Sequence, residues 1–158
     1  EKNLKKAAEG RGIDSSRLVF AEKIQHAEHL ARHRLADLFL DTFNYNAHTT
    51  ASDALWAGLP IVTKLGESFS SRVAASLLNA VGVPELITDS IEEYEKLAYK
   101  LATDSDYLKA FQYKLSSAAY SKPLFDTERF VRHLEVCYIE VYRRYHDGNQ
   151  LQTICVED

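Results

Sequence analysis

The chain has few cysteines, no long apolar run and no excess of positive charge, and each of these features excludes a class of protein. Its two cysteines, Cys137 and Cys155, are too few for a disulfide framework or a zinc site, so we expect a reducing, cytosol-like compartment. No stretch approaches the ~18 apolar residues that span a bilayer, and no signal peptide is visible. The net charge of −4 offers no basic surface for nucleic acid. We therefore expect a cytoplasmic protein that binds neither nucleic acid nor membrane.

What the sequence does contain is an alternation of short apolar runs with helix-like segments. Because the runs are rich in β-formers and lack an in/out alternation, they predict strands buried on both faces of a parallel sheet. The expected fold class is α/β, a Rossmann-like parallel sheet flanked by helices, with Trp56 packed in its core. The expected strands are residues 18–20, 38–40, 60–63 and 85–88, and the expected helices are 2–9, 27–36, 50–57, 70–81, 91–102, one after Asp104, and 127–146.

The stretch NAHTTASDALWAGLPIV, residues 46–62, is a candidate binding site. It lies between the end of a predicted strand and the start of a helix, where open α/β sheets bind ligands. The first amides of a helix have no partners and its dipole adds positive charge, so His48, Thr49 and Thr50 could complete a phosphate cradle. Thr50 to Asp53 also matches a capping box, which closes many helices that bind nothing. The pattern alone leaves both interpretations open.

A second polar cluster lies in HAEHLARHR, residues 26–34. His29 and Arg32 are three residues apart and therefore share a helix face. Because the segment follows the first predicted strand, we expect it at the same carboxyl edge, where an imidazole could stack on a base and a guanidinium could bind the carbonyl of that base. One alternative is a solvated polar helix face. Another is a metal site, but the spacing lacks HExxH and a carboxylate partner.

Together these blocks resemble the C-terminal catalytic region of the O-linked N-acetylglucosamine transferase family, which includes SPINDLY-like proteins and bacterial members with tetratricopeptide repeats. The resemblance covers roughly residues 3–147, and its segments are RLVF, EHLARHRLADLFLDT, NAHTTASDALWAGLPIVT, GESFSSRVAASLL and PLFDTERF. It implies the C-terminal, nucleotide-sugar-binding lobe of a GT-B glycosyltransferase. It also implies that the first strand of this lobe lies upstream of Glu1, so we expect a fragment of a longer protein.

The resemblance assigns the diphosphate end of the donor to one helix start. His48, Thr49 and Thr50 match the pyrophosphate-binding motif of the family, and they would stabilise the departing nucleoside diphosphate. Asp53 matches the acid that binds the ribose. No metal or other cofactor is expected, because fixed hydrogen-bond donors can neutralise the leaving group.

The resemblance assigns the nucleoside end to the second cluster. His29 matches the histidine that packs on the base, and Arg32 matches the arginine beside it. The backbone of Ile24 matches the position that bonds the uracil edge. His26 stands where the animal enzymes have a lysine that contacts the ribose, so the sequence departs from the family pattern there.

The function implied by the resemblance is donor binding for inverting transfer of GlcNAc from UDP-GlcNAc to serine or threonine of proteins. The alternatives are a GDP-fucose-dependent protein O-fucosyltransferase of the SPINDLY type, an asparagine glucosyltransferase, and a non-catalytic nucleotide-binding or interaction module. In the family, the catalytic lobe with its phosphate-binding lysine, and the tetratricopeptide repeats that recruit protein acceptors, lie upstream. The isolated chain is therefore expected to be inactive.

Three parts are expected along the chain. Residues 1–122 should form the nucleotide-sugar-binding lobe, since Pro123 interrupts the helical pattern. Residues 123–147 should form a long helix that crosses to the missing lobe, with its apolar stripe partly exposed here. Residues 148–158, after the last helix, should form a flexible tail.

Overall fold

The centre of the molecule is a three-stranded parallel sheet in the order β1-β2-β3. The structure is a computed structural model that describes residues 1–118, 122–150 and 152–156. In the sheet, Phe39 of β1 pairs with Ile61 of β2, and Thr63 of β2 pairs with Ile87 of β3. The strands are β1 (Phe39–Leu40), β2 (Ile61–Lys64) and β3 (Ile87–Thr88). Three of the predicted strands are confirmed, and so is the α/β fold class.

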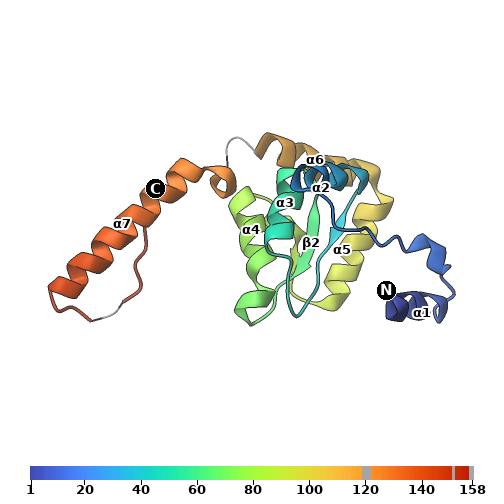
Figure 1. The fold of residues 1–158 in the computed structure, drawn as a ribbon, viewed down its shortest axis with the longest axis horizontal. Helices are drawn as coiled ribbons and strands as arrows, with labels where there is room; N and C mark the ends of the chain where they lie inside the picture. Colours follow the sequence, from blue (N-terminus) through green and yellow to red (C-terminus); the bar gives the residue numbers. More distant parts are fainter. Residues whose placement is uncertain (119–121, 151, 157–158) are drawn as a thin grey trace.

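Helices connect these strands and cover both faces of the sheet. Figure 1 shows α3 and α4 on one side of β2 and α5 on the other. The α-helices are α1 (Lys2–Glu9), α2 (His26–Arg32), α3 (Thr49–Trp56), α4 (Val73–Val81), α5 (Ile91–Thr103), α6 (Ser105–Ala118) and α7 (Thr127–His146). Short 3₁₀ turns lie at Ser15–Arg17, His33–Leu35, Phe69–Ser71, Pro84–Leu86 and Pro123–Phe125. Every helix expected from the sequence is present.

The core forms because β2 is apolar on both faces and each flanking helix turns an apolar stripe toward it. Ile61, Val62 and Thr63 of β2 are fully buried. Large buried leucines from the helices surround the strand, and burial of each contributes about 2 kcal/mol relative to leaving it exposed. They are Leu55 of α3, Leu78 of α4, Leu101 of α5 and Leu115 of α6.

A glycine returns the chain from α3 to the sheet. Gly58 has φ +83°, the left-handed conformation that ends helices, and Leu59 N–H then donates to the carbonyl of Ala54. Pro60 follows and prevents the helix from continuing. This reversal brings β2 alongside β1, so the loop after β1 and the start of α3 lie at the carboxyl end of the sheet.

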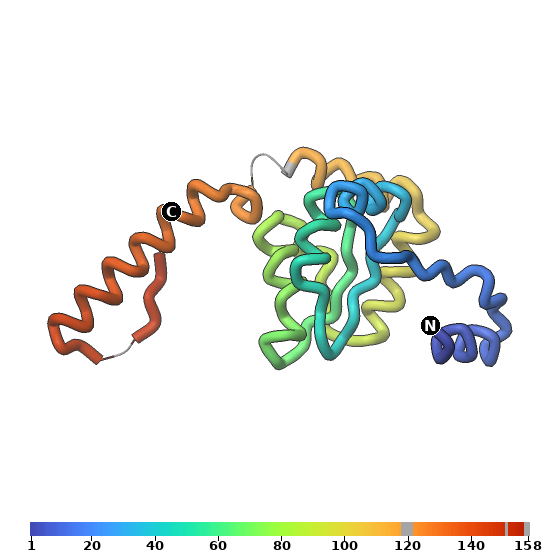
Figure 2. The backbone as a smooth tube through the Cα atoms, in the orientation of Figure 1, coloured from blue at the N-terminus to red at the C-terminus, as the bar shows by residue number. Residues whose placement is uncertain are grey.

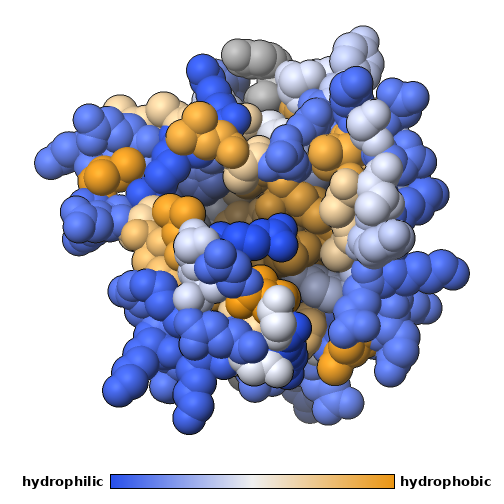
Figure 3. All heavy atoms as spheres, turned by 90° about the vertical axis from the view of Figure 1, so that its right-hand side faces the viewer, coloured by the Kyte–Doolittle hydropathy of each residue, from blue (hydrophilic) through white to orange (hydrophobic). Residues whose placement is uncertain are grey.

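The prediction of a strand at residues 18–20 is wrong. These residues are irregular, and Val19 is 88% exposed. A strand needs a pairing partner, and β1 pairs only with β2 within the described residues. Figure 1 shows this blue segment crossing the right-hand side of the molecule. Figure 3 is drawn from that side and shows apolar atoms in a hollow that is surrounded by hydrophilic residues.

The placement of α2 also differs from the prediction. Because residues 18–20 form no strand, α2 does not follow a carboxyl end. It precedes β1 in the chain, and Figure 1 shows it at the top of the view, whereas loops 41–48 and 65–71 lie at the bottom. The side chains of α2 that approach the candidate site are His26 and His29. They do so at Asp53, in the second turn of α3.

Trp56 is not a core residue, contrary to the prediction. Its side chain is 49% exposed, and its ring lies edge-on to Phe125 at a centroid distance of 5.0 Å. Trp56 is the last residue of α3, and Ala51, Ala54 and Leu55 occupy the face of this helix that is buried.

α1 and α7 project from opposite sides of this body, as the tube in Figure 2 shows. No residue of α7 is buried, so the apolar stripe expected along this helix is exposed. The domain boundary predicted at residues 122–123 lies beside residues 119–121, which are outside the described residues. Among the helices of the described residues, none has the length and hydropathy of a membrane span.

Candidate functional site

The loop after β1 is fastened to the sheet by the side chain of Asp41. This residue is only 4% exposed, and its carboxylate accepts hydrogen bonds from the backbone N–H of Ala47 at 2.7 Å and from the hydroxyl of Thr63 at 2.6 Å. The hydroxyl of Tyr94 on α5 donates to the carbonyl of Asp41 at 3.0 Å. Burial and the Asp41 charge raise the pKa of Tyr94 to about 12. The loop is therefore closed tightly just before the helix start.

His48 is the N-cap residue at that helix start, with φ −103° and ψ −93°. Its ring stacks on Tyr45 at a centroid distance of 4.7 Å and an interplanar angle of 14°. Its Nε2 lies 3.4 Å from the carbonyl oxygen of Ser70 in the neighbouring loop. Two loops at the carboxyl end of the sheet thus fix one imidazole.

The start of α3 leaves hydrogen-bond donors free. The amides of Ala51 and Ser52 both donate to the carbonyl of His48, but those of Thr49 and Thr50 make no hydrogen bond within the described part of the chain. The side chains of Thr49 and Thr50 are exposed. Free amides at the positive end of a helix dipole are groups that can accept an anion.

The capping-box interpretation of Thr50 and Asp53 is wrong. The helix begins at Thr49, so Thr50 is already inside its first turn and cannot act as the N-cap. No side chain caps this helix, and the Asp53 carboxylate faces α2 instead. Ser90 differs, because its hydroxyl accepts the amide hydrogen of Glu93 and caps α5.

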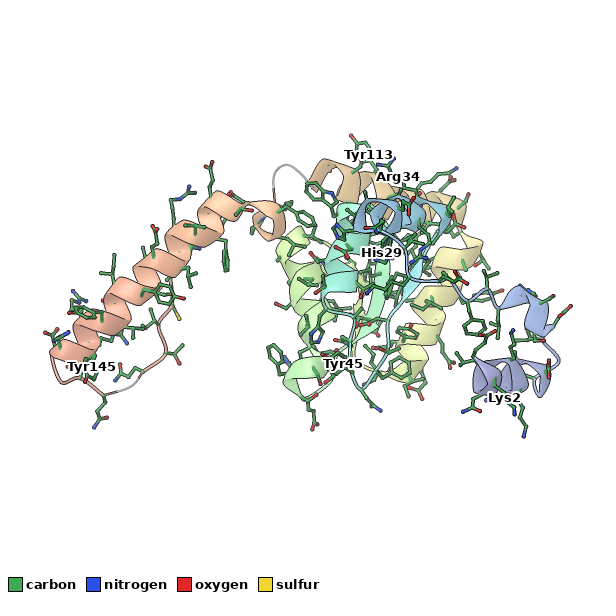
Figure 4. All side chains as sticks on the ribbon, in the orientation of Figure 1. Lys2, His29, Arg34, Tyr45, Tyr113 and Tyr145 are labelled. Carbon is green, nitrogen blue, oxygen red and sulfur yellow. The ribbon has the colours of Figure 1, made fainter. Side chains whose placement is uncertain are left out.

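The α2 cluster and α3 meet at Asp53. Nε2 of His29 lies 3.6 Å from one Asp53 oxygen, and Nε2 of His26 lies 3.8 Å from the other. His26 is largely exposed, whereas His29 and Asp53 are partly buried. Figure 4 shows His29 directed toward the middle of the body, beside the strands, with Tyr45 below it in the loop region. The two clusters found in the sequence are therefore brought together at Asp53.

Arg32 fixes both the tautomer of His29 and the segment before α2. Its guanidinium donates to Nδ1 of His29 at 3.0 Å and to the carbonyl of Glu22 at 2.9 Å. A guanidinium can only donate, so Nδ1 accepts, and a neutral His29 carries its proton on Nε2, the nitrogen that faces Asp53. The segment held by Glu22 contains Ile24, which is exposed at the side of this surface.

A cavity of about 460 Å³ opens at this helix start. Its wall consists of residues 39–42 and 45–50, so it includes His48, Thr49 and Thr50 but no lysine or arginine. The positive groups that the helix start contributes to it are therefore its amides. Within the described ranges, no group of three His, Cys, Asp or Glu side chains could hold a metal ion.

Sequence reasoning missed four residues that build this site. Tyr45 supplies the stacking partner of His48, and Asp41, Thr63 and Tyr94 form the hydrogen-bonded support behind the loop. One signal was available, because an acid that directly ends a buried strand is costly unless its oxygens accept hydrogen bonds. The contribution of Tyr94, 53 residues further along the chain, has no local signal.

Comparison with known proteins gives a consistent result. The family model described as "Glycosyl transferase family 41" matches residues 1–134. The chain is 40% identical over 154 residues to the UDP-N-acetylglucosamine–peptide N-acetylglucosaminyltransferase of Caenorhabditis elegans, covering 98% of this chain and 13% of that protein. It is 37% identical to the probable enzyme of this name, SEC, of Arabidopsis thaliana, covering 96% of this chain and 16% of that protein.

A solved structure agrees with these relatives. A mutant of the O-GlcNAc transferase of Thermobaculum terrenum superposes with a TM-score of 0.80 at 32% identity, covering 90% of this chain and 27% of that one. The chain therefore spans about a quarter or less of the proteins it matches here.

Proposed function

Since the chain belongs to glycosyltransferase family 41, we propose that it is the donor-binding part of a protein O-GlcNAc transferase. The full enzyme would transfer GlcNAc from UDP-GlcNAc to serine or threonine of protein acceptors, with inversion. One observation carries this proposal. Thr49 and Thr50, whose amides are free, line a cavity at the carboxyl end of β1, and this supports binding of the diphosphate of a nucleotide sugar there.

In this proposal the helix start acts on the leaving group. Negative charge develops on the nucleoside diphosphate as the glycosidic bond breaks, and the amides of Thr49 and Thr50, their hydroxyls and the His48 imidazole are already oriented before it develops. A single preorganised donor of this kind contributes on the order of 3 kcal/mol to lowering the barrier. Such donors could perform this task without a metal ion, and no cofactor is proposed.

The nucleoside would lie along the surface that joins α3 to α2. Asp53 is proposed to accept a hydrogen bond from the ribose, and His29 to pack on the base with Arg32 beside it. The backbone at Ile24 would bind the edge of the base. His26, on the exposed side of Asp53, would contact the ribose from solvent. The Arg32–Glu22 hydrogen bond supports this assignment, because it holds the segment with Ile24 next to His29.

The acceptor protein is proposed to bind mainly outside this chain. An upstream catalytic lobe and tetratricopeptide repeats would complete the full protein, and α7, with its exposed apolar stripe, would cross to that lobe. A reducing cytoplasm is the proposed location, which is consistent with the free thiols of Cys137 and Cys155.

A nucleotide titration tests the proposal directly. The isotope-labelled chain is titrated with UDP and, separately, with GDP, and amide chemical shifts are recorded. We expect UDP to shift the amides of His48, Thr49 and Thr50 and those near Ile24 and His29. A selective response to GDP would favour the fucosyl alternative. No response from the full-length protein to either nucleotide would support the non-catalytic alternative and contradict the proposal.

Activity measurements separate a binding role from a structural one. In the full-length enzyme, His48→Ala and Thr49→Ala are expected to lower turnover far more than thermal stability. Parallel losses of both would indicate that the helix start is only a structural element. The isolated chain is expected to transfer no sugar, because a GT-B site lies between two lobes, and turnover by the purified chain would contradict this.

A further inference from the structure

The buried carboxylate of Asp41 has no role in the function proposed above. Within the described residues no lysine, arginine or histidine forms an ion pair with it, although it is almost fully buried. A carboxylate in such a place is costly unless its oxygens accept hydrogen bonds. The Ala47 amide supplies one such bond and the Thr63 hydroxyl the other, both at the short distances of charge-assisted bonds.

These bonds connect the sheet to the residue that precedes the helix start. Asp41 is anchored to β2 by its backbone, which donates to the carbonyl of Val62 at 3.1 Å, and by its side chain through Thr63. At the other end, Ala47 immediately precedes His48. The Asp41–Ala47 bond therefore closes the loop of residues 42–46 and determines how the chain enters α3.

The two residues before His48 are both held by hydrogen bonds. The amide of Ala47 donates to the Asp41 carboxylate, and the amide of Asn46 donates to the carbonyl of Ser70 at 2.8 Å. Together these bonds fix the backbone that leads into His48, the N-cap residue of α3. The direction of the Thr49 and Thr50 amides follows from the conformation of His48, because these two residues come directly after it.

We propose that Asp41 is a positioning residue for the diphosphate site, acting through Ala47 and held in place by Thr63. The inference rests on the proposed function, since it concerns the same helix start. Asp41 is part of the cavity wall, but its two carboxylate oxygens are engaged by Ala47 and Thr63, so its action would be through Ala47 and not through a bond to the donor. It would hold the entry into α3 so that free amides point into the cavity before any ligand binds, which reduces the cost of ordering the loop on binding.

Substitutions on β2 and β3 separate this role from simple stabilisation. Thr63→Val is nearly isosteric and removes the hydroxyl that holds Asp41. Thr88→Val is its matched control, because Thr88 is another buried threonine of the sheet, and its hydroxyl donates to the carbonyl of Thr63 at 3.0 Å rather than to Asp41. Thr63→Ser keeps the hydroxyl and serves as the conservative variant.

The measurement uses the full-length enzyme that contains this chain. The Kd for UDP is determined by calorimetry, the KM values for donor and acceptor by kinetics, and Tm by thermal unfolding. Thr63→Val should weaken UDP binding about tenfold, because binding must then reorder the entry into α3, and it should raise the donor KM but not the acceptor KM. Thr88→Val should lower Tm about as much as Thr63→Val does, but it should change the Kd for UDP less than about twofold. Thr63→Ser should bind UDP as the unmodified enzyme does.

Failure of the positioning role and failure of the proposed function give different results. Equal losses of UDP affinity in Thr63→Val and Thr88→Val, or a lowered Tm with an unchanged Kd in Thr63→Val, would overturn the positioning role and leave the donor site intact. Failure of the unmodified full-length protein to bind UDP would instead overturn the proposed function on which this role rests.

Discussion

Nε2 of His29 on α2 lies 3.6 Å from the carboxylate of Asp53 on α3, although the two residues belong to different helices. This approach joins the parts of the site that are proposed to bind the nucleoside and the diphosphate. Since Arg32 occupies the Nδ1 of His29, the proton of a neutral imidazole lies on Nε2, the nitrogen that faces Asp53. The other side of the carboxylate faces the exposed His26, where a ligand hydroxyl has access.

This geometry predicts that the Asp53 carboxylate accepts a hydrogen bond from a ribose hydroxyl. Asp53→Asn should weaken UDP binding by about 1–2 kcal/mol, because a charge-assisted hydrogen bond is replaced by a neutral one. The loss should be much smaller for 2′-deoxy-UDP, which lacks one of the hydroxyls available to the carboxylate. Calorimetric titration of both nucleotides into both proteins gives the coupling energy. Equal losses for the two nucleotides would show that Asp53 does not bind the 2′-hydroxyl.

Local signals account for most of the fold that was predicted correctly. The apolar run at Ile61–Thr63, the stop at Gly58 and the cap at Ser90 act over a few residues, so they can be read from the sequence. Residues 18–20 have the same apolar character but no strand beside them, and pairing is a property of the whole sheet. Trp56 was misplaced because its neighbours on α3 already fill the buried face.

In the candidate site, too, some features follow from the local sequence and others depend on residues far along the chain. His48, Thr49, Thr50 and Asp53 were recognisable as polar residues at the start of a helix, but their pattern also fitted a capping box. What separates the two possibilities is the closure of the preceding loop by Asp41, which starts α3 at Thr49. That closure depends on Thr63, which is 22 residues away in the sequence. Sequence patterns can therefore identify the residues of such a site but not their geometry.

Gly66 is predicted to be required for the loop that supports His48. A Cβ at this position would overlap the Cβ and Oγ of Ser71, so Gly66→Ala must displace Ser71 and with it the Ser70 carbonyl that faces His48. We expect a loss of about 1–3 kcal/mol in unfolding free energy, typical of overpacking, and weaker UDP binding. Chemical denaturation and a UDP titration measure the two effects.

Gly58→Ala provides the control for Gly66→Ala. Its cost comes from the positive φ of Gly58, and a Cβ there would meet no atom within 4 Å. Because Gly58 lies beyond the far end of α3, this variant should lose stability but keep its UDP affinity. Unchanged UDP binding in Gly66→Ala would mean that the loop of residues 65–71 does not hold His48 in the binding conformation.

The Ser/Thr-x-x-acid patterns that begin at Ser90 and at Thr50 should respond in opposite ways to alanine. Ser90→Ala removes a formed cap on α5 and should cost about 1 kcal/mol of unfolding free energy without changing UDP affinity. Thr50→Ala removes no cap, so it should change stability by less than about 0.5 kcal/mol while weakening UDP binding. Urea unfolding and UDP titration of both variants test this. A destabilised Thr50→Ala with unchanged affinity would favour a plain structural role.

Tyr94 should make stability depend on pH in the alkaline range. Its pKa is raised from 10.0 to about 12 in the folded protein by burial and by the charge of Asp41. The folded state therefore keeps the phenolic proton more tightly than the unfolded state does. The stabilising contribution is fully present below pH 10, the unfolded pKa, and is lost as the pH rises toward 12. A shift of this size corresponds to roughly 2–3 kcal/mol at its limit.

Comparison with Tyr94→Phe isolates this contribution, because all other groups titrate in both proteins. At neutral pH the variant should be less stable by about 1 kcal/mol, the value of the lost hydrogen bond to the Asp41 carbonyl. Above pH 10 the unmodified chain loses stability relative to the variant, so the difference should shrink and then change sign. Urea unfolding followed by far-ultraviolet circular dichroism between pH 7 and about pH 11.5 measures it, since the two pKa values bracket this loss. A difference that stays constant with pH would mean that the phenol ionises equally easily in both states, and that Asp41 and Tyr94 are not coupled.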